Sequence, residues 1–368
     1  MVRQDADAGS TASDGAFPAI NVDVTSLQKQ DTDAEPNVRE RADSQRQLTQ
    51  RAENAYKSDL KLPIGAEFEH RSFWGRIRGA TKKVLCLDRG GRDFPLFPDD
   101  TFLVSYPRSG NTWARFLIAN LLDGDSPITF ANIDRKIPEP AAVSRRQLAR
   151  VPRPRIIKSH EYFDPRYRRL IYIVRDPRDV AVSNYYFQLK KRFIPDGYPM
   201  DEYISLFVST GIDVFASWAE NVTSWIATRG TSRDFLLLKY EEMTKEPERE
   251  LSKIASFLGI PAAPERLARA VELSSPQRMR ELEKQETDVW QVTRNTRKDI
   301  PFVRDAKSGA WGRALSKNQL ERIESAWAPI MVALGYEPTL VNRAKPDPLL
   351  ASSLPRQFAL ERLLPCSE

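Results

Sequence analysis

Residues 101–122, TFLVSYPRSGNTWARFLIANLL, constrain the fold more than any other part of this 368-residue chain. Thr101 to Tyr106 is a short, mostly apolar run rich in β-branched and aromatic residues, which is typical of a buried parallel strand. From Thr112 onward, apolar residues recur at the spacing of one helix face, and Asp123-Gly124 ends the pattern. The segment therefore predicts a strand, a tight turn and a helix in direct succession.

The turn between this strand and this helix, Pro107 to Gly110, has the properties of an anion site. Backbone N–H groups at the positive end of a helix bind phosphate or another tetrahedral anion, and Arg108 adds a cation there. The Walker pattern GxxxxGK[ST] fits poorly, because the turn has one glycine and Arg108 precedes it. We therefore predict an anion other than the β/γ-phosphate of a magnesium nucleotide.

Three further apolar runs are predicted to form strands, at residues 155–160, 170–174 and 235–239. Because helical patterns lie between them, we expect an α/β fold, a three-layer sandwich with a mostly parallel central sheet. Ligands of such sheets bind outside the carboxyl ends of the strands. Cationic or titratable side chains follow three of the strands, so we expect one shared site around Arg108, Lys158, His160 and Arg175.

Composition favours an anionic ligand without identifying it. The formal net charge is +6 and the pI is about 9.2, which fits an anionic substrate and also weak nucleic-acid binding. The two cysteines, Cys86 and Cys366, lie far apart, and no His/Cys/carboxylate cluster has ligand spacing, so we predict no disulfide framework and no metal. Without a signal peptide or a run of about eighteen apolar residues, the chain is predicted to be cytoplasmic, with no membrane span.

The chain divides into three predicted parts. Residues 1–57 are polar, poor in aromatics and aperiodic, which is typical of a disordered or loosely ordered leader. Residues 58–338 are predicted to form the folded domain, in which residues 294–313 lack a period and should form a long loop or lid. A helix that opens with a capping-box pattern at Ser316 ends at Gly335. Residues 339–368 are predicted to be a C-terminal tail.

The turn and its flanks resemble the 5′-phosphosulfate loop of the cytosolic-type sulfotransferases, which reads roughly Tyr-Pro-Lys-Ser-Gly-Thr-Thr-Trp. Tyr106 to Trp113 follows that loop position for position, with Arg for Lys and Asn for Thr. The resemblance extends over most of residues 101–335 and implies that residues 58–338 are a sulfotransferase domain with a P-loop-like strand–loop–helix. The donor it implies is 3′-phosphoadenosine-5′-phosphosulfate (PAPS), which leaves PAP as product. The loop residues implied to bind it are Arg108, Ser109, Gly110, Asn111, Thr112 and Trp113.

Other motifs of the family are implied to bind the rest of the donor. Its 3′-phosphate pattern is similar to Arg-Asn-Pro-x-Asp-Val-x-Val-Ser, and Arg175 and Ser183 stand at the same spacing of eight positions. Trp113 matches the adenine-stacking tryptophan and Tyr240 an adenine-contacting tyrosine, although both could equally be core aromatics. The late pattern Arg-Lys-Gly-x-x-Gly-x-Trp is matched at Arg304, Gly309 and Trp311, whereas a shifted register uses Lys307. Both Arg304 and Lys307 therefore remain candidates for the 3′-phosphate.

Lys158-Ser159-His160 resembles the family's Lys-Thr-His, whose histidine is the general base. The implied reaction is an in-line transfer of the sulfuryl group from PAPS to an acceptor hydroxyl. Histidine suits this task because its pKa lies near working pH. Lys158 and Arg108 would neutralise charge on the transferring group and on the leaving phosphate.

Two other functions stay open at this point, a P-loop-like kinase using ATP and a non-enzymatic basic nucleotide- or RNA-binding protein. The first does not explain the spacing of Arg175 and Ser183, and the second leaves Lys158 and His160 without a role. We therefore expect an enzyme that binds no nucleic acid, and assembly as a homodimer stays open. The acceptor could be a sugar, a phenol, a lipid-linked alcohol or a small metabolite. Basic loops, including Lys136 to Arg155, favour a carbohydrate or otherwise anionic acceptor.

Overall fold

The computed structural model describes residues 94–123, 126–209, 215–341 and 344–355. The predicted leader, residues 1–57, lies outside these ranges, as do both cysteines. Along the described residues the elements are β1 (Thr101–Ser105), α3 (Asn111–Leu122), α4 (Ile133–Lys136), α5 (Arg145–Arg150), β2 (Ile156–Ser159), β3 (Arg169–Val174), α6 (Pro177–Lys191), α7 (Met200–Ser209), α8 (Trp218–Arg229), β4 (Phe235–Lys239), α9 (Tyr240–Lys245), α10 (Pro247–Leu258), α11 (Pro264–Leu273), α12 (Pro276–Glu286), α13 (Trp311–Ala314), α14 (Lys317–Ala333) and α15 (Pro348–Ser353).

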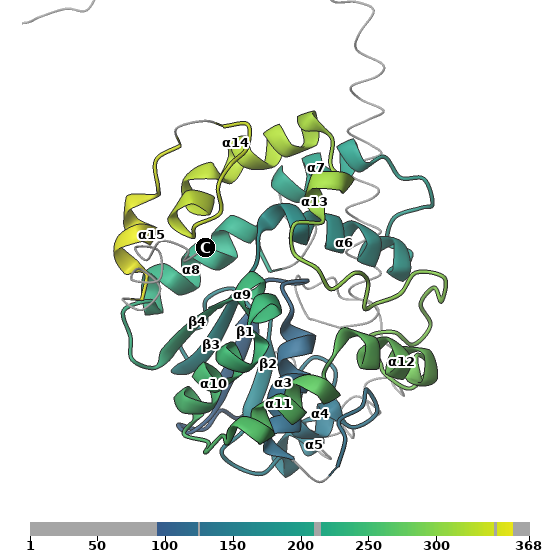
Figure 1. The fold of residues 1–368 in the computed structure, drawn as a ribbon, viewed down its shortest axis with the longest axis vertical. Helices are drawn as coiled ribbons and strands as arrows, with labels where there is room; N and C mark the ends of the chain where they lie inside the picture. Colours follow the sequence, from purple (N-terminus) through teal and green to yellow (C-terminus); the bar gives the residue numbers. More distant parts are fainter. Residues whose placement is uncertain (1–93, 124–125, 210–214, 342–343, 356–368) are drawn as a thin grey trace, which may run out of the picture. The chain divides into compact units, whose positions relative to one another are not determined.

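The four strands form one parallel sheet in the order β2-β1-β3-β4 (Figure 1). This arrangement confirms the predicted α/β fold. In the register, Val104 lies beside Ser159, and Ser105 lies beside Ile173. All four carboxyl ends therefore meet at one edge. Because the chain passes from β1 to β2 on one side and then to β3 on the other, β1 stands at the switch point where α/β sheets bind ligands.

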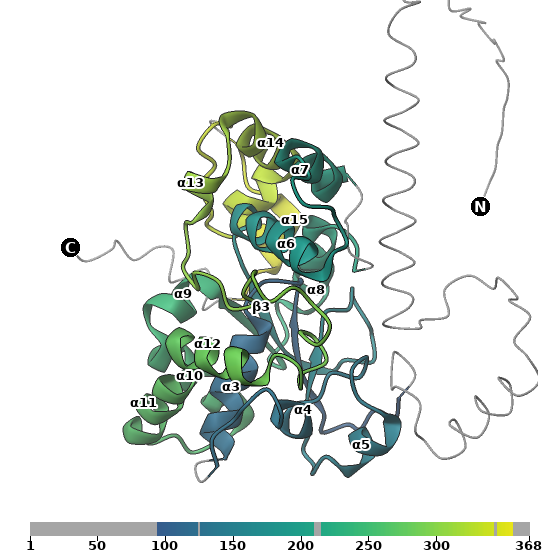
Figure 2. The ribbon, with the colours of Figure 1, turned by 90° about the vertical axis from the view of Figure 1, so that its right-hand side faces the viewer.

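Each face of the sheet packs against helices, which makes the three layers (Figure 2). On one face, Leu103, Ile171 and Leu238 belong to a buried cluster with side chains of α3, α10, α11 and α12. On the other face, Tyr172 donates a hydrogen bond of 2.8 Å to Asn221 of α8, and Trp225 of α8 is fully buried. Trp218 and Trp225 of α8 are thus core residues, and the sheet is covered on both sides.

Helix α6 starts directly beyond the carboxyl end of β3. The helix begins at Pro177, because the Asp176 side chain accepts from the Arg178 N–H and caps it, and because a proline is favoured at the first helical position. Arg178 and Asp179 therefore belong to the first turn of α6, directly beyond the carboxyl end of β3. The strand–turn–helix of residues 101–122 was predicted with boundaries within one residue.

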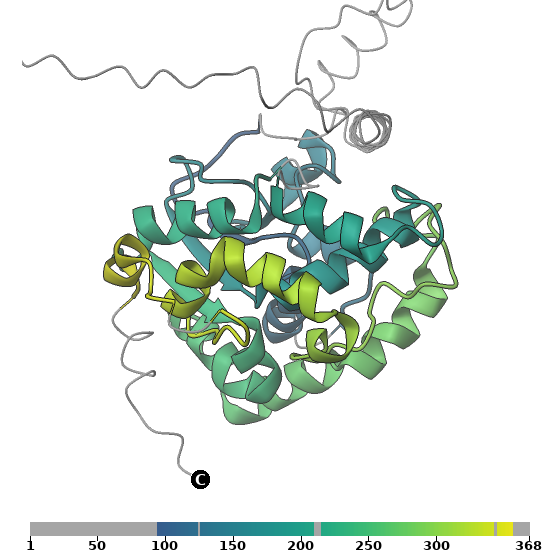
Figure 3. The same cartoon turned by 90° about the horizontal axis from the view of Figure 1, so that it is seen from above.

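The last helices belong to the folded domain. The capping box at Ser316 is confirmed, and α14 packs against α6, α7 and α8 (Figure 3). Beyond α14 the sequence predicted a tail from residue 339, yet α15 packs against α8 and α14 and its Leu350 is fully buried. Residues 339–341 and 344–355 thus extend the domain, because they supply apolar side chains and backbone donors to it. No helix of the described residues is long and apolar enough to cross a membrane.

Candidate active site

The turn at the switch point has a backbone that only glycine permits at its end. Arg108 and Gly110 have positive φ angles of 68° and 93°, and a Cβ on Gly110 would lie 2.5 Å from the Tyr240 ring. No side chain caps the N-terminus of α3, and the buried Ser109 hydroxyl has no hydrogen-bond partner. The turn therefore keeps its donors for a ligand, as an anion site requires.

The remaining loop candidates have different surroundings. Asn111 is buried, and its side chain donates to the carbonyls of Leu103 and Ser159, so it ties β1 to β2. Thr112 is half-buried in the first turn of α3. The Trp113 indole N–H donates to the Ser274 carbonyl at 3.0 Å, and its ring meets Tyr240 edge-on at 6.0 Å. Asn111 thus acts through the strands rather than as an exposed donor.

Three guanidinium groups gather beside the turn, those of Arg108, Arg175 and Arg304. Arg108 donates to the Ser183 hydroxyl at 3.2 Å and stacks between the rings of Phe187 and Phe302. Burial, followed by the charges of Arg175 and Arg304, lowers the pKa of Arg108 to about 10. Like charges held this close repel one another, and a bound anion would relieve the repulsion.

Arg175 is fixed at the centre of this group. Its guanidinium donates to the Arg108 carbonyl at 3.0 Å and to the Lys307 carbonyl at 3.2 Å, and it lies 4.1 Å from the centroid of the Tyr240 ring. Its buried Nε has no hydrogen-bond partner, and the nearest carboxylate, Asp179, stands 3.9 Å away. The predicted pair, Arg175 and Ser183, is therefore connected through Arg108, which contacts both residues. The Arg175 Nε–H remains as a donor for a ligand.

The loop of residues 294–313, called the late loop below, is held beside these guanidinium groups by Asp179. Both oxygens of Asp179 accept backbone N–H groups of that loop, from Gly309 at 2.7 Å and from Trp311 at 3.0 Å. Arg304 stacks 3.7 Å from the Tyr186 ring centroid, and its charge reaches Arg108, whereas the Lys307 side chain is exposed. Of the two cations that the sequence left open, Arg304 is the one that joins the guanidinium group.

His160 directly follows β2 and faces the end of β1. Its Nδ1 lies 2.7 Å from the Ser105 carbonyl oxygen. Because a carbonyl only accepts, Nδ1 carries the hydrogen and Nε2 keeps its lone pair. Burial, followed by the charge of Lys158, lowers the pKa of His160 to about 3, so the imidazole is neutral at pH 7. The site thus holds a neutral base with a fixed tautomer.

Lys158 is paired with a carboxylate that the sequence analysis missed. Its ammonium lies 2.6 Å from the Glu139 carboxylate, and its backbone N–H donates to the Pro138 carbonyl at 2.9 Å. Although burial opposes it, the charges of Lys158 and His160 hold the pKa of Glu139 at about 2. Glu139 is the only acidic residue among residues 136–155, and that was the signal available in the sequence.

A family model described as "Sulfotransferase domain" matches residues 98–335. The chain belongs to the sulfotransferase family. It is 28% identical over 255 residues to a 3-beta-hydroxysteroid sulfotransferase of Cavia porcellus, covering 66% of this chain and 86% of the relative. It is 29% identical over 294 residues to Sulfotransferase 1B1 of Mus musculus, covering 75% and 93%. A mouse sulfotransferase, SULT7A1, solved as a complex with PAP, has a TM-score of 0.52 and 25% identity, covering 65% and 85%. The chain is accordingly an enzyme, a PAPS-dependent sulfotransferase.

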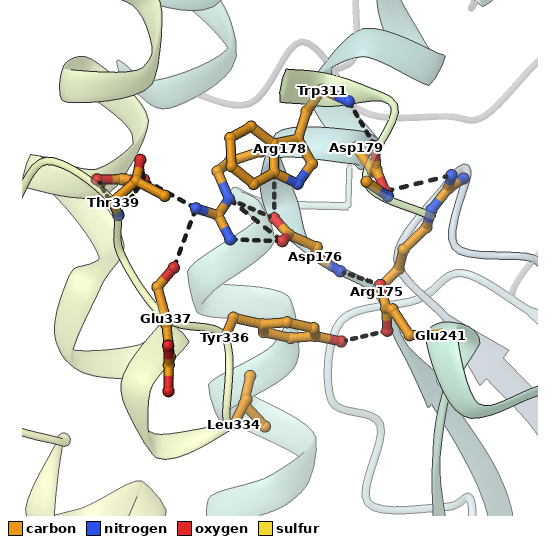
Figure 4. Close-up of polar contacts among 12 residues, drawn as sticks. Arg175, Asp176, Arg178, Asp179, Glu241, Trp311, Leu334, Tyr336, Glu337 and Thr339 are labelled. Carbon is orange, nitrogen blue, oxygen red and sulfur yellow. Dashed lines mark hydrogen bonds and ion pairs between the residues drawn. The ribbon is translucent and has the colours of Figure 1, made fainter. Parts of the chain in front are cut away.

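Helix α6, which begins two residues after Arg175, also anchors the C-terminal part of this sulfotransferase (Figure 4). Arg178 lies 2.7 Å from the Asp176 carboxylate and 2.8 Å from that of Glu324, and it donates to the Glu337 carbonyl at 3.1 Å. The Trp311 ring covers its guanidinium at 3.9 Å. Arg178 therefore joins α6, α14, the late loop and the segment after α14 in one buried network.

The carboxylates that a kinase would use for magnesium are committed elsewhere in this sulfotransferase. Asp176 is paired with Arg178, and Asp179 accepts two backbone N–H groups beside Arg175. A cation would be repelled by these guanidinium groups. Among the described residues, no group of three or more His, Cys, Asp or Glu side chains could hold a metal ion. The ATP kinase is therefore not favoured.

Proposed function

We propose that this sulfotransferase transfers a sulfuryl group from PAPS to the hydroxyl of a small alcohol, with His160 as the general base. The observation that carries the proposal is the gathering of Arg108, Arg175 and Arg304 around the turn at the end of β1, beside the free Nε2 of His160. The three guanidinium groups suit an anion, and the His160 imidazole beside them can accept a proton. Sulfuryl transfer needs both, because the PAPS donor carries phosphate groups and the acceptor hydroxyl must lose its proton.

The residues fit PAPS by their unused donors and their charge. Arg175, Arg304 and Ser183 would hold the 3′-phosphate, since the buried Arg175 Nε lacks a partner and like charges surround it. The turn from Ser109 to Trp113 would hold the 5′-phosphate at the N-terminus of α3. When bound, PAPS supplies the sulfuryl group and the phosphate that leaves. Trp113 and Tyr240 are the aromatic candidates for the adenine.

His160 would take the proton of the acceptor hydroxyl on Nε2 as the oxygen forms its bond to sulfur. Three features suit it to this role. Its Nδ1–H is held by the Ser105 carbonyl, its imidazole is neutral, and its own carbonyl accepts from Asn221 at 3.2 Å. A base fixed in this way loses little freedom at the moment of transfer. Lys158 supplies a positive charge beside it.

The contacts of Arg108 differ from those expected for a residue that binds the sulfuryl group. The sequence analysis assigned its cation to the sulfuryl group, but its guanidinium donates to Ser183 and to the Phe302 carbonyl, because two aromatic rings hold it there. Its charge also reaches His160, whose pKa it lowers slightly. We therefore propose that Arg108 stands between the 3′-phosphate ligands and the transferring group, and that Lys158 is the cation next to the base.

For the acceptor we propose a small alcohol with an apolar skeleton. The basic loop expected to favour an anionic acceptor has two of its cations engaged, since Arg153 pairs with Asp99 and the buried Arg155 with Asp100. An aromatic ring, that of Phe215, lies 5.7 Å from the His160 ring. The relative from Cavia porcellus is named for 3-beta-hydroxysteroids, which are alcohols of this kind.

Donor choice tests the proposal without an acceptor. We expect PAP to bind far more tightly than ADP, because the 3′-phosphate is what distinguishes them, and calorimetry measures both. Charged hydrogen bonds are worth roughly 1.5–3 kcal/mol, so Arg175→Ala should weaken PAP about tenfold or more and ADP much less. Lys307→Ala is the matched control, since its side chain is exposed. Equal affinity of the wild type for PAP and ADP would exclude this donor.

The boundary of the catalytic domain is also a proposal. We propose that residues 58–338 with the packed segment that follows are sufficient for sulfuryl transfer. A protein that starts at residue 58 should keep the wild-type rate and melting temperature, because the composition of residues 1–57 offers little apolar surface to bury. Differential scanning calorimetry and PAPS turnover check this together. A drop of several degrees on truncation would mean that residues 1–57 pack on the domain.

A further inference from the structure

A buried group of charges lies next to the proposed base and is larger than the Lys158–Glu139 pair. Arg115, on α3, is fully buried, donates to the Ile137 carbonyl at 3.0 Å and pairs with Asp134 of α4. Arg115 and Asp134 both act electrostatically on Lys158. The group thus holds two cations and two carboxylates, and its charges balance only while His160 is neutral.

Proton transfer to His160 disturbs that balance. Lys158 lies on β2 and His160 directly follows this strand, and the charge of Lys158 acts on the His160 imidazole. An imidazolium formed there meets the positive charges of Lys158 and, further away, of Arg108. Glu139 is the group that opposes both, since its charge favours the protonated form of His160. Its carboxylate therefore matters most after the proton has moved.

We propose that Glu139 is a positioning residue for the transfer step, whose carboxylate holds the Lys158 ammonium and offsets the positive charge that His160 acquires. The proposal rests on the proposed function, because it assumes that His160 is the base. It goes beyond that function by giving a task to a side chain of the loop between α4 and α5. A salt bridge kept only for stability would leave kcat unchanged as long as the protein stays folded.

The chain offers a control ion pair at the opposite end of the sheet, where Arg155 directly precedes β2. Asp100 precedes β1 and pairs with Arg155, which precedes β2, at 2.6 Å, and both side chains are buried. This pair lies at the amino ends of the strands, away from His160. Asp100→Asn removes a buried carboxylate charge and Glu139→Gln a half-buried one, and each leaves a buried cation without its partner, so both should lower the melting temperature. Only Glu139→Gln should change the chemistry.

The first test follows turnover of PAPS with 1-naphthol as acceptor. We expect Glu139→Gln to lower kcat roughly ten- to hundredfold while the Kd of PAP stays within about twofold, and Glu139→Asp to regain part of the rate. In a Lys158→Met background the same change should still lower kcat, but by less than in the wild type, because only the charge on His160 is left for Glu139 to offset. Asp100→Asn should keep kcat. Wild-type kcat in Glu139→Gln overturns the proposal.

The second test needs no donor, acceptor or turnover. The chain has two histidines, so the imidazole signals of His160 can be assigned by comparison with His70→Ala in an NMR titration. Lys158→Met should raise the pKa of His160, and adding Glu139→Gln should lower it again. Identical titration in the two variants overturns the role of Glu139 even if His160 is the base. If instead His160→Ala keeps full activity, the proposed function fails and this titration result still stands.

Discussion

Replacing His160 by alanine is expected to lower the rate of sulfuryl transfer by roughly 10²–10⁴-fold, which is the usual contribution of a positioned general base. The imidazole is neutral and its Nδ1–H is bound to the Ser105 carbonyl, so its Nε2 keeps a lone pair that can accept a proton. The same substitution should leave PAP affinity nearly unchanged, because the phosphates are assigned to Arg175, Ser183 and the turn after β1. Rapid-quench measurement of label transfer from PAPS, with calorimetry of PAP, separates the two effects.

Two controls make this result interpretable. His70→Ala removes the only other histidine and should keep the wild-type rate. The melting curve of His160→Ala should match the wild type, since loss of the ring removes one hydrogen bond at a half-buried position. A folded His160→Ala protein that transfers sulfuryl at the wild-type rate would show that this histidine is structural.

The strand–turn–helix and the shared edge of the sheet could be predicted because their causes are local. An apolar run of strand length, a helical period after Thr112 and one glycine at the end of the turn determine the element order. Parallel strands then bring their carboxyl ends together whatever the loops do, which is why Arg108, Lys158 and Arg175 could be expected at one site. Arg175 directly follows β3 and Ser183 lies on α6, so the short connection between this strand and this helix brings the two residues to the same edge of the sheet.

The partners of these residues could not be predicted, because tertiary packing selects them. Glu139 reaches Lys158 from a proline-rich loop without a period, and the Asp179 oxygens bind a backbone 130 and 132 positions away. Arg108 was expected to face the sulfuryl group, but the two rings that hold it belong to distant segments. The direction of the Arg108 side chain depends on these neighbouring rings. A sequence motif gives the type of residue at a position and not the direction of its side chain.

The predicted tail was misplaced for a related reason. Residues after Pro338 show no helical or strand period, so the sequence gives no sign that they pack. In the structure the backbone N–H groups of Thr339, Leu340 and Val341 all donate to Glu324. Every residue except proline has the same backbone N–H group, so these contacts cannot be predicted from the residue types. The segment packs because Glu324 of α14 is fully buried and its carboxylate needs several donors.

The largest stability effect is expected at Arg178, which serves that acid. Arg178→Met leaves the carboxylates of Asp176 and Glu324 without their shared cation while both remain buried. Removing one partner of a buried ion pair costs roughly 3–5 kcal/mol, because the other charge stays without compensation. For a domain of this size that corresponds to a fall in Tm on the order of 10 °C. The parts that Arg178 joins are α6, α14, the loop that carries Trp311 and the segment after α14.

The exposed Arg249 provides the matched control, since it also pairs with three carboxylates, those of Glu242, Glu246 and Glu250, but with nearly half of its side chain in water. Arg249→Met should change Tm by little, because surface ion pairs are worth about 0–1 kcal/mol.

The pH dependence of the melting temperature gives a second check. Backbone donors and Arg178 keep Glu324 ionised against the cost of burial, so wild-type stability from this group is present above its unfolded pKa and is lost as pH falls. Without Arg178 the Glu324 carboxylate takes up a proton more readily, and the gap in Tm between variant and wild type should narrow from pH 7 to pH 5. An unchanged Tm for Arg178→Met, or a difference in Tm that widens on acidification, would mean that the Arg178 network does not hold α6 to the segment after α14.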